Sequence, residues 1–132
     1  MKLSRKPNDY WYQEANAKLE ALAARLEAIL GHRAHIYGAS LPAGHSCPMA
    51  VDCLTKVDRA TGKVTDGKLQ EFRCFAATME AMSPDLRRLV WHNFDILRAA
   101  KTREAMLEVL DRSFPADADA MRPGLDGDFF NQ

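Results

Sequence analysis

The sequence has no apolar run long enough to cross a bilayer, and no apolar stretch follows its basic first residues. We therefore predict neither a membrane-spanning segment nor a secretory signal. The formal net charge is +0, so no overall field favours nucleic acid or a membrane surface. The three cysteines are an odd number, which argues against a closed disulfide framework. These absences indicate a cytoplasmic protein with reduced thiols.

The sequence does contain enough apolar residues for one domain. Its 132 residues are 47% hydrophobic and 27% charged, as is typical of a chain that buries a single core. We predict a mixed α/β fold that is predominantly helical, with few short strands. Residues 1–7 are expected to be a flexible basic lead-in, and residues 8–132 to form the single domain.

The first part of the domain, residues 8–31, is predicted to be one amphipathic helix that Gly31 ends. Apolar residues recur there at steps of three and four, which places them on one face. We expect this face to pack on its own domain; the alternative is pairing with the helix of a partner. The face consists of Ala15, Leu19, Leu22, Leu26 and Ile29.

Residues 35–82 are predicted to hold a cysteine-bearing loop and a small hairpin. A short strand at residues 35–39 leads into the loop, where Pro and Gly break regular structure. Val57 and Val64 flank a polar turn, which favours a β-hairpin between them. A helix is expected to begin at or just after Cys74.

Residues 83–114 are predicted to be a helical pair. Ser83 is a candidate N-cap, with Pro84 at the first helical position, and Thr102 is the candidate N-cap of the second helix. Pro115 ends that second helix.

The last part, residues 115–132, is predicted to be a loosely held tail. It finishes on an Asp-Gly turn followed by Phe129 and Phe130, two large apolar rings with little apolar sequence around them. We expect this to be a chain that stops in the middle of a larger α/β fold. The two rings are then exposed, or they pair with a second copy in a homo-oligomer.

The cysteines are the strongest candidates for a site. Cys47 and Cys53 lie close in sequence with Pro48 between them, Cys74 comes from the mouth of a helix, and His45 precedes them. Three or four such ligands bind zinc or an iron–sulfur cluster when they converge. The spacing matches no strong metal-binding signature, so ordinary buried thiols remain an alternative, as does a Cys47–Cys53 disulfide.

The histidines allow further interpretations. His45 is two residues from Cys47 on an extended loop and is a candidate general base beside that thiol, with Asp52 the nearest carboxylate. His32 and His35 suit the negative end of the first helix. His92 is more typical of a polar helix face than of a ligand.

A run of basic residues lies within the predicted helical pair. It is either a solvated helix face or a surface that contacts the phosphate backbone of nucleic acid. It comprises Arg87, Arg88, Arg98, Lys101 and Arg103.

Five short motifs, in this order, resemble a phage and bacterial family known as the gene product eighty-eight family. They are Ser40-Leu41-Pro42-Ala43, Cys47-Pro48, Cys53, Cys74-Phe75-Ala76 and Gly127-Asp128-Phe129. The resemblance implies an enzyme-like α/β fold of phage origin and singles out the cysteines. It also implies that Asp128 ends a strand and faces an active-site mouth, as in an α/β barrel; a plain turn aspartate is the alternative.

The sequence departs from the family pattern in one place. Where the family has a β-strand, this chain has residues 122–126, in which Pro123 and Gly124 are poor strand formers. Members of the family also continue well past this point.

Two functions compete. The first is a phage-type enzyme domain that binds zinc or an iron–sulfur cluster and acts on nucleic acid or its precursors in the host cytoplasm. Its metal ligands are Cys47, Cys53, Cys74 and His45, and its catalytic groups are His45 and Asp128. The second is a non-enzymatic helical interaction module whose cysteines are structural.

Overall fold

The computed structural model describes residues 5–14, 19–47, 53–68 and 74–126. Its main sheet has three strands in the order β1-β2-β5, formed by β1 (Gln13–Glu14), β2 (Ile36–Ser40) and β5 (Ala120–Asp126). β1 is antiparallel to β2, and β5 is parallel to it. The mixed α/β fold predicted from the sequence is confirmed.

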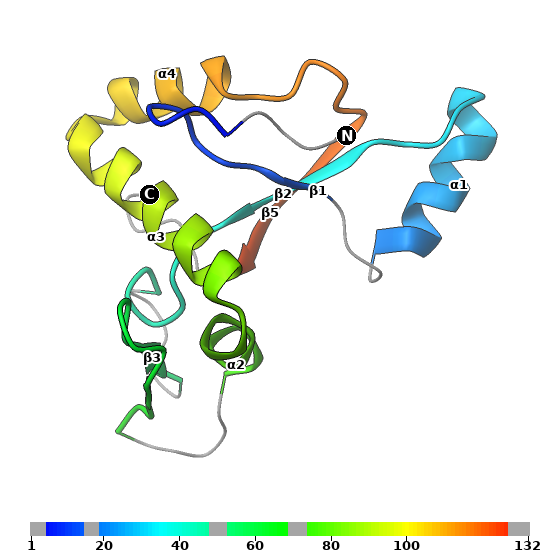
Figure 1. Ribbon diagram of the computed structural model, residues 1–132. Helices are drawn as coiled ribbons and strands as arrows, with labels where there is room; N and C mark the ends of the chain where they lie inside the picture. Colours follow the sequence, from blue (N-terminus) through cyan, green and yellow to red (C-terminus); the bar gives the residue numbers. More distant parts are fainter. Residues whose placement is uncertain (1–4, 15–18, 48–52, 69–73, 127–132) are drawn as a thin grey trace.

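The central strand β2 is covered on both faces, and all five of its residues are buried. Tyr37 and Ala39 pack against α3 (Pro84–Ala100) and α4 (Arg103–Arg112) in the largest apolar cluster. Ile36 belongs to a second cluster with α1 (Glu20–Leu30). Figure 1 shows α3 and α4 on one side of the sheet and α1 on the other. This double covering is typical of a strand within a parallel arrangement.

A third cluster lies below the sheet in Figure 1, where α2 (Phe75–Met82) packs on a small hairpin. The hairpin consists of β3 (Lys56–Val57) and β4 (Val64–Thr65), which pair with Val57 opposite Val64. The predicted hairpin and the helix start at Cys74 are therefore confirmed.

The predicted helix ends are also confirmed. The Ser83 hydroxyl accepts a hydrogen bond from the Leu86 N–H at 3.2 Å, and the Thr102 hydroxyl accepts one from the Ala105 N–H at 3.1 Å. Gly31 ends α1 in the left-handed conformation, with φ 78°. No helix in the described parts of the chain is long and apolar enough to cross a membrane.

The prediction of one helix over residues 8–31 is wrong. α1 begins only at Glu20, and the preceding segment runs extended through Tyr10 and Tyr12 into β1. Both rings are buried, and their hydroxyls donate to the carbonyls of Ser40 and Leu110 at 3.0 and 2.9 Å. Burying two aromatic rings with satisfied hydroxyls outweighs the helix propensity of this segment.

The apolar face predicted for that helix is only partly buried. Leu19 is buried and Leu26 half-buried, but Leu22 and Ile29 are 44% and 79% exposed. Ala15 lies outside the described residues. Because α1 touches the sheet only through one edge of its face, the rest of its apolar stripe is open to solvent.

The prediction of a loosely held tail is wrong for residues 120–126, which form β5. The register runs from Ile36 opposite Ala120 to Ser40 opposite Asp126, with a shift between Gly38 and Ser40. That shift gives β5 two extra residues around Pro123, so a residue without an N–H lies where the ladder is interrupted. Phe129 and Phe130 lie outside the described residues.

Asn93 on α3 joins the N-terminal segment to β2. Its side-chain oxygen accepts the Trp11 N–H at 2.7 Å, and its amide donates to the carbonyls of Trp11 and Ser40 at 3.0 and 3.2 Å. The side chain is completely buried. A buried amide that satisfies three backbone groups fixes the relative position of three segments.

We predict that Asn93→Ala destabilises the fold by about 2–4 kcal/mol, because it removes these bonds and leaves the Trp11 N–H without its acceptor. Urea denaturation measures the free energy of unfolding. The exposed Asn8 provides the control, and Asn8→Ala is expected to cost less than about 0.5 kcal/mol. Equal stabilities of the two variants would contradict the role of Asn93.

Candidate functional site

The candidate site lies where the two parallel strands end. Residues 41–47, which we term the cysteine loop, leave the carboxyl end of β2 at Ser40. Ser40 is opposite Asp126, the last residue of β5. Ligands of α/β folds bind beyond the carboxyl ends of parallel strands, so this edge is the expected position for a functional site. Asp128, the predicted catalytic carboxylate, follows β5 but lies outside the described residues.

The cysteine loop is a tight turn held from within. The Ser46 N–H and hydroxyl both donate to the Pro42 carbonyl, at 3.1 and 2.7 Å. Gly44 has φ 73°, and a Cβ there would lie 2.3 Å from the Thr55 carbonyl oxygen. Only glycine permits both the left-handed backbone and this close approach.

Glu80 of α2 holds the same loop from outside. Its carboxylate accepts the Ala43 N–H at 2.5 Å, and the side chain is completely buried. Sequence reasoning did not identify this residue as part of the site. The signal was available: Glu80 is three residues after the buried Ala77, so a carboxylate falls on the inward face of an otherwise apolar helix.

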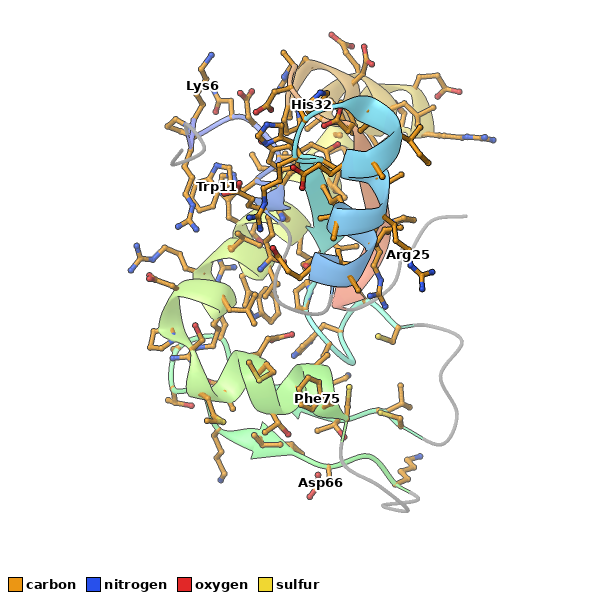
Figure 2. The ribbon with its side chains drawn as sticks, turned by 90° about the vertical axis from the view of Figure 1, so that its right-hand side faces the viewer. Lys6, Trp11, Arg25, His32, Asp66 and Phe75 are labelled. Atoms are coloured by element: carbon orange, nitrogen blue, oxygen red, sulfur yellow. The ribbon has the colours of Figure 1, made fainter. Side chains whose placement is uncertain are left out.

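Two of the three predicted cysteine ligands meet. Cys53 and Cys74 come from separate segments, and their thiols lie near enough for the pKa of Cys74 to depend on Cys53. Burial raises the pKa of the Cys74 thiol, and the neighbouring Cys53 raises it further. Cys74 lies at the N-cap position of α2, next to Phe75, which Figure 2 labels at that end of the helix. No disulfide joins the three cysteines, all of which are described.

The complete ligand set is not assembled in this structure. Among the described residues, no group of three or more His, Cys, Asp or Glu side chains is arranged to hold a metal ion. Cys47 ends the described part of the cysteine loop and is half-buried. The predicted convergence of Cys47, Cys53 and Cys74 on one ion therefore stays a prediction.

His45 projects from the cysteine loop toward α3. Its ring lies edge-on to Trp91, with ring centroids 4.7 Å apart. Partial desolvation of the imidazole, together with the nearby Lys56, lowers its pKa, which favours the neutral form of the ring. A neutral imidazole suits either a metal ligand or a general base. Asp52, the carboxylate considered as its partner, lies outside the described residues.

The other histidines have structural contacts. His32 Nε2 lies 3.1 Å from the Asp119 carboxylate, and the His35 N–H donates to Asp119 at 2.8 Å. The bond from the backbone N–H of His35, followed by the contact with the His32 ring, lowers the pKa of the Asp119 carboxyl. His92 stacks on Trp11 with ring centroids 3.6 Å apart, and its Nε2 lies 2.8 Å from the Asp9 carbonyl.

The predicted basic patch is divided along α3. Arg87 donates to the Glu80 and Ala81 carbonyls at 3.0 and 3.2 Å, and so binds the end of α2. Arg88 lies 3.8 Å from the exposed Asp85. Arg98 lies about 16 Å further along the helix, at 1.5 Å per residue, over the Phe94 ring.

The remaining two basic residues lie beyond the end of α3. Lys101 is in the left-handed conformation at φ 61°, and Arg103 begins α4. Contact of these five residues with nucleic acid stays a prediction.

The family model of gene product 88 matches residues 2–132, which include every described strand and helix. The chain belongs to the gene product 88 family. Neither a curated protein nor a solved structure is significantly similar to it. Membership in the gene product 88 family confirms the resemblance given by the Ser-Leu-Pro-Ala and cysteine motifs.

We predict that Gly44→Ala is more harmful than Gly31→Ala, although both glycines have positive φ. At Gly31 nothing lies within 4 Å of an added Cβ, so the cost is the backbone strain of about 1–2 kcal/mol. At Gly44 the Thr55 backbone must also move, and we expect about 3 kcal/mol or more. Thermal and urea unfolding measure the difference; equal losses would show that the cysteine loop is not tightly seated.

Proposed function

We propose that this chain is a phage-type enzyme domain whose cysteines bind zinc or an iron–sulfur cluster, and that it acts on nucleic acid or its precursors. The observation that carries the proposal is that the thiols of Cys53 and Cys74 lie close together. Two thiols from segments separated by the hairpin lie close enough for Cys53 to raise the pKa of Cys74, beside the loop that presents Cys47.

The chemistry of the donor set fits such a centre. Thiols placed together in a half-buried position lose their protons when a metal binds, because the metal ligand is the thiolate. Cys47 and the neutral His45 on the cysteine loop are the candidates for the third and fourth ligands. Zinc supplies a Lewis acid or a structural link, and a cluster supplies an electron.

The position of the thiols supports an enzymatic role rather than a purely structural one. The cysteine loop begins at the carboxyl end of β2, and Asp128 follows the carboxyl end of β5 two residues after Asp126. In this proposal Asp128 and His45 are the acid–base groups at the mouth of the site.

We predict that the reduced protein, reconstituted with Zn²⁺ under anaerobic conditions, retains about one equivalent of metal. Cys53→Ser and Cys74→Ser are expected to abolish this binding, as measured by elemental analysis of gel-filtered protein. Reconstitution with iron and sulfide, followed by absorption spectroscopy, tests the cluster.

Two histidines provide the matched control for this experiment. His45→Ala is expected to lower metal retention, whereas His32→Ala, on a residue that pairs with Asp119, leaves it unchanged. A wild-type protein that holds neither zinc nor a cluster after both reconstitutions would overturn the proposal.

One observation favours the interaction module as a second candidate function. α1 exposes an apolar row, with Leu22, Ile29 and Leu30 at 44%, 79% and 41% exposure. An exposed stripe on a helix is a docking surface for another helix, and a second copy of this chain is the simplest occupant.

If α1 pairs between copies, the protein is a dimer and the double variant Leu22→Glu/Ile29→Glu is a folded monomer. Sedimentation equilibrium gives the mass, and circular dichroism checks the fold. Ala24→Glu/Ala28→Glu on the same exposed helix is the control for added charge and is expected to leave the dimer intact. A monomeric wild-type protein would show that α1 does not pair two copies of this chain.

A further inference from the structure

A groove with aromatic and arginine walls runs beside α3, and no cysteine lines it. Its cavity is about 400 Å³, within the range of about 300–1,000 Å³ typical of small-molecule sites. Trp11 lines it from the N-terminal segment and Arg59 from the turn of the β3–β4 hairpin. The wall from α3 includes Arg87, Arg88, Trp91 and His92.

Figure 2 shows Trp11 projecting on the side of the molecule opposite to Arg25 of α1, so the groove is separate from the exposed face of α1. The spacing of the α3 residues accounts for the wall. Arg87 and Arg88 precede Trp91 by four and three residues, so each arginine is a neighbour of Trp91 on the helix surface.

The flat surfaces in the groove are fixed in place. The Trp11 ring is stacked on His92 at an interplanar angle of 11°, and its indole N–H donates to the Lys6 carbonyl at 2.8 Å. The Trp91 ring packs edge-on to Phe94. The indole nitrogen of Trp91 is buried and has no hydrogen-bond partner within the described part of the chain. Fixed aromatic faces of this kind are platforms on which a planar ring stacks.

The charge of the groove is positive. Three guanidinium groups, from Arg59, Arg87 and Arg88, line it with one carboxylate, that of Asp95. Asp95 is paired with Arg59 at 2.5 Å, which also places the Arg59 guanidinium 5.2 Å from the Trp91 ring centre. Arg88 is exposed, and its guanidinium lies 3.8 Å from the Asp85 carboxylate, which is too far for a hydrogen bond. The Arg88 guanidinium is therefore available to an anion.

We propose that this groove binds a nucleotide, with the base stacked among the aromatic side chains and the phosphate held by Arg88 and Arg59. A planar ring that carries an anionic group is the ligand class that satisfies both walls at once. The ligand is either a free nucleotide or one unit of a single strand. His45 touches Trp91, so the bound nucleotide lies beside the cysteine loop.

This inference deepens the proposed function by naming the substrate class, and its test is independent of metal. The sequence has two tryptophans, and both line the groove. Tryptophan fluorescence therefore reports on the groove alone. Metal-free protein is titrated with adenosine 5′-monophosphate, adenosine, inorganic phosphate and a thymidine hexanucleotide.

We expect saturable quenching by the nucleotide, with adenosine and phosphate each binding at least about tenfold more weakly. Arg88→Ala is expected to weaken nucleotide binding by about tenfold. Arg25→Ala, the same charge change on an exposed residue of α1 outside the groove, leaves it unchanged. A hexanucleotide that binds more tightly than the monophosphate, with the same loss in Arg88→Ala, identifies a single strand as the source; the reverse order identifies a free nucleotide.

Three results would overturn the inference. They are no quenching by any probe, equal losses in Arg88→Ala and Arg25→Ala, and phosphate or adenosine alone binding as tightly as the nucleotide. Loss of metal binding in Cys53→Ser with intact nucleotide binding would separate the two sites. Nucleotide binding by a wild-type protein that retains no metal would refute the metal proposal while sustaining this one.

Discussion

The arrangement depends on the buried amide of Asn93. Its hydrogen bonds connect α3 to Trp11 in the N-terminal segment and to Ser40 at the end of β2. Trp11 is a wall of the groove, and Ser40 is the last residue before the cysteine loop. One side chain thus positions parts of both candidate sites. A hydrogen bond between buried groups costs more to break than its net contribution suggests, because the unpaired partners remain desolvated.

The first half of the cysteine loop is held by polar groups from two helices. Asn93 reaches the Ser40 carbonyl, and Glu80 of α2 reaches the Ala43 N–H. Both side chains are completely buried in apolar surroundings. Buried polar groups specify one geometry, because alternative positions of the loop would leave them unpaired. A loop that presents potential metal ligands requires this kind of support from surrounding side chains.

The parts of the fold that could be predicted from the sequence depend on residues close together in the chain. The caps at Ser83 and Thr102 and the end of α1 at Gly31 involve partners within four residues. The prediction of an N-terminal helix over residues 8–31 was wrong, because the burial of Tyr10 and Tyr12 depends on Ser40 and Leu110, which are distant in sequence. Likewise, β5 forms because β2 offers its edge and the register shift accommodates Pro123.

The site was predictable only in its residue types. The sequence identified all three cysteines. The approach of Cys53 to Cys74 requires the hairpin to fold onto α2, which no spacing encodes. The groove was missed because its walls come from three separate segments. Trp91 links the two regions: one neighbour of its ring is His45 of the cysteine loop, and another is Arg59 of the groove. Trp91 therefore belongs both to the surroundings of His45 and to the wall of the groove, and no spacing in the sequence connects these residues.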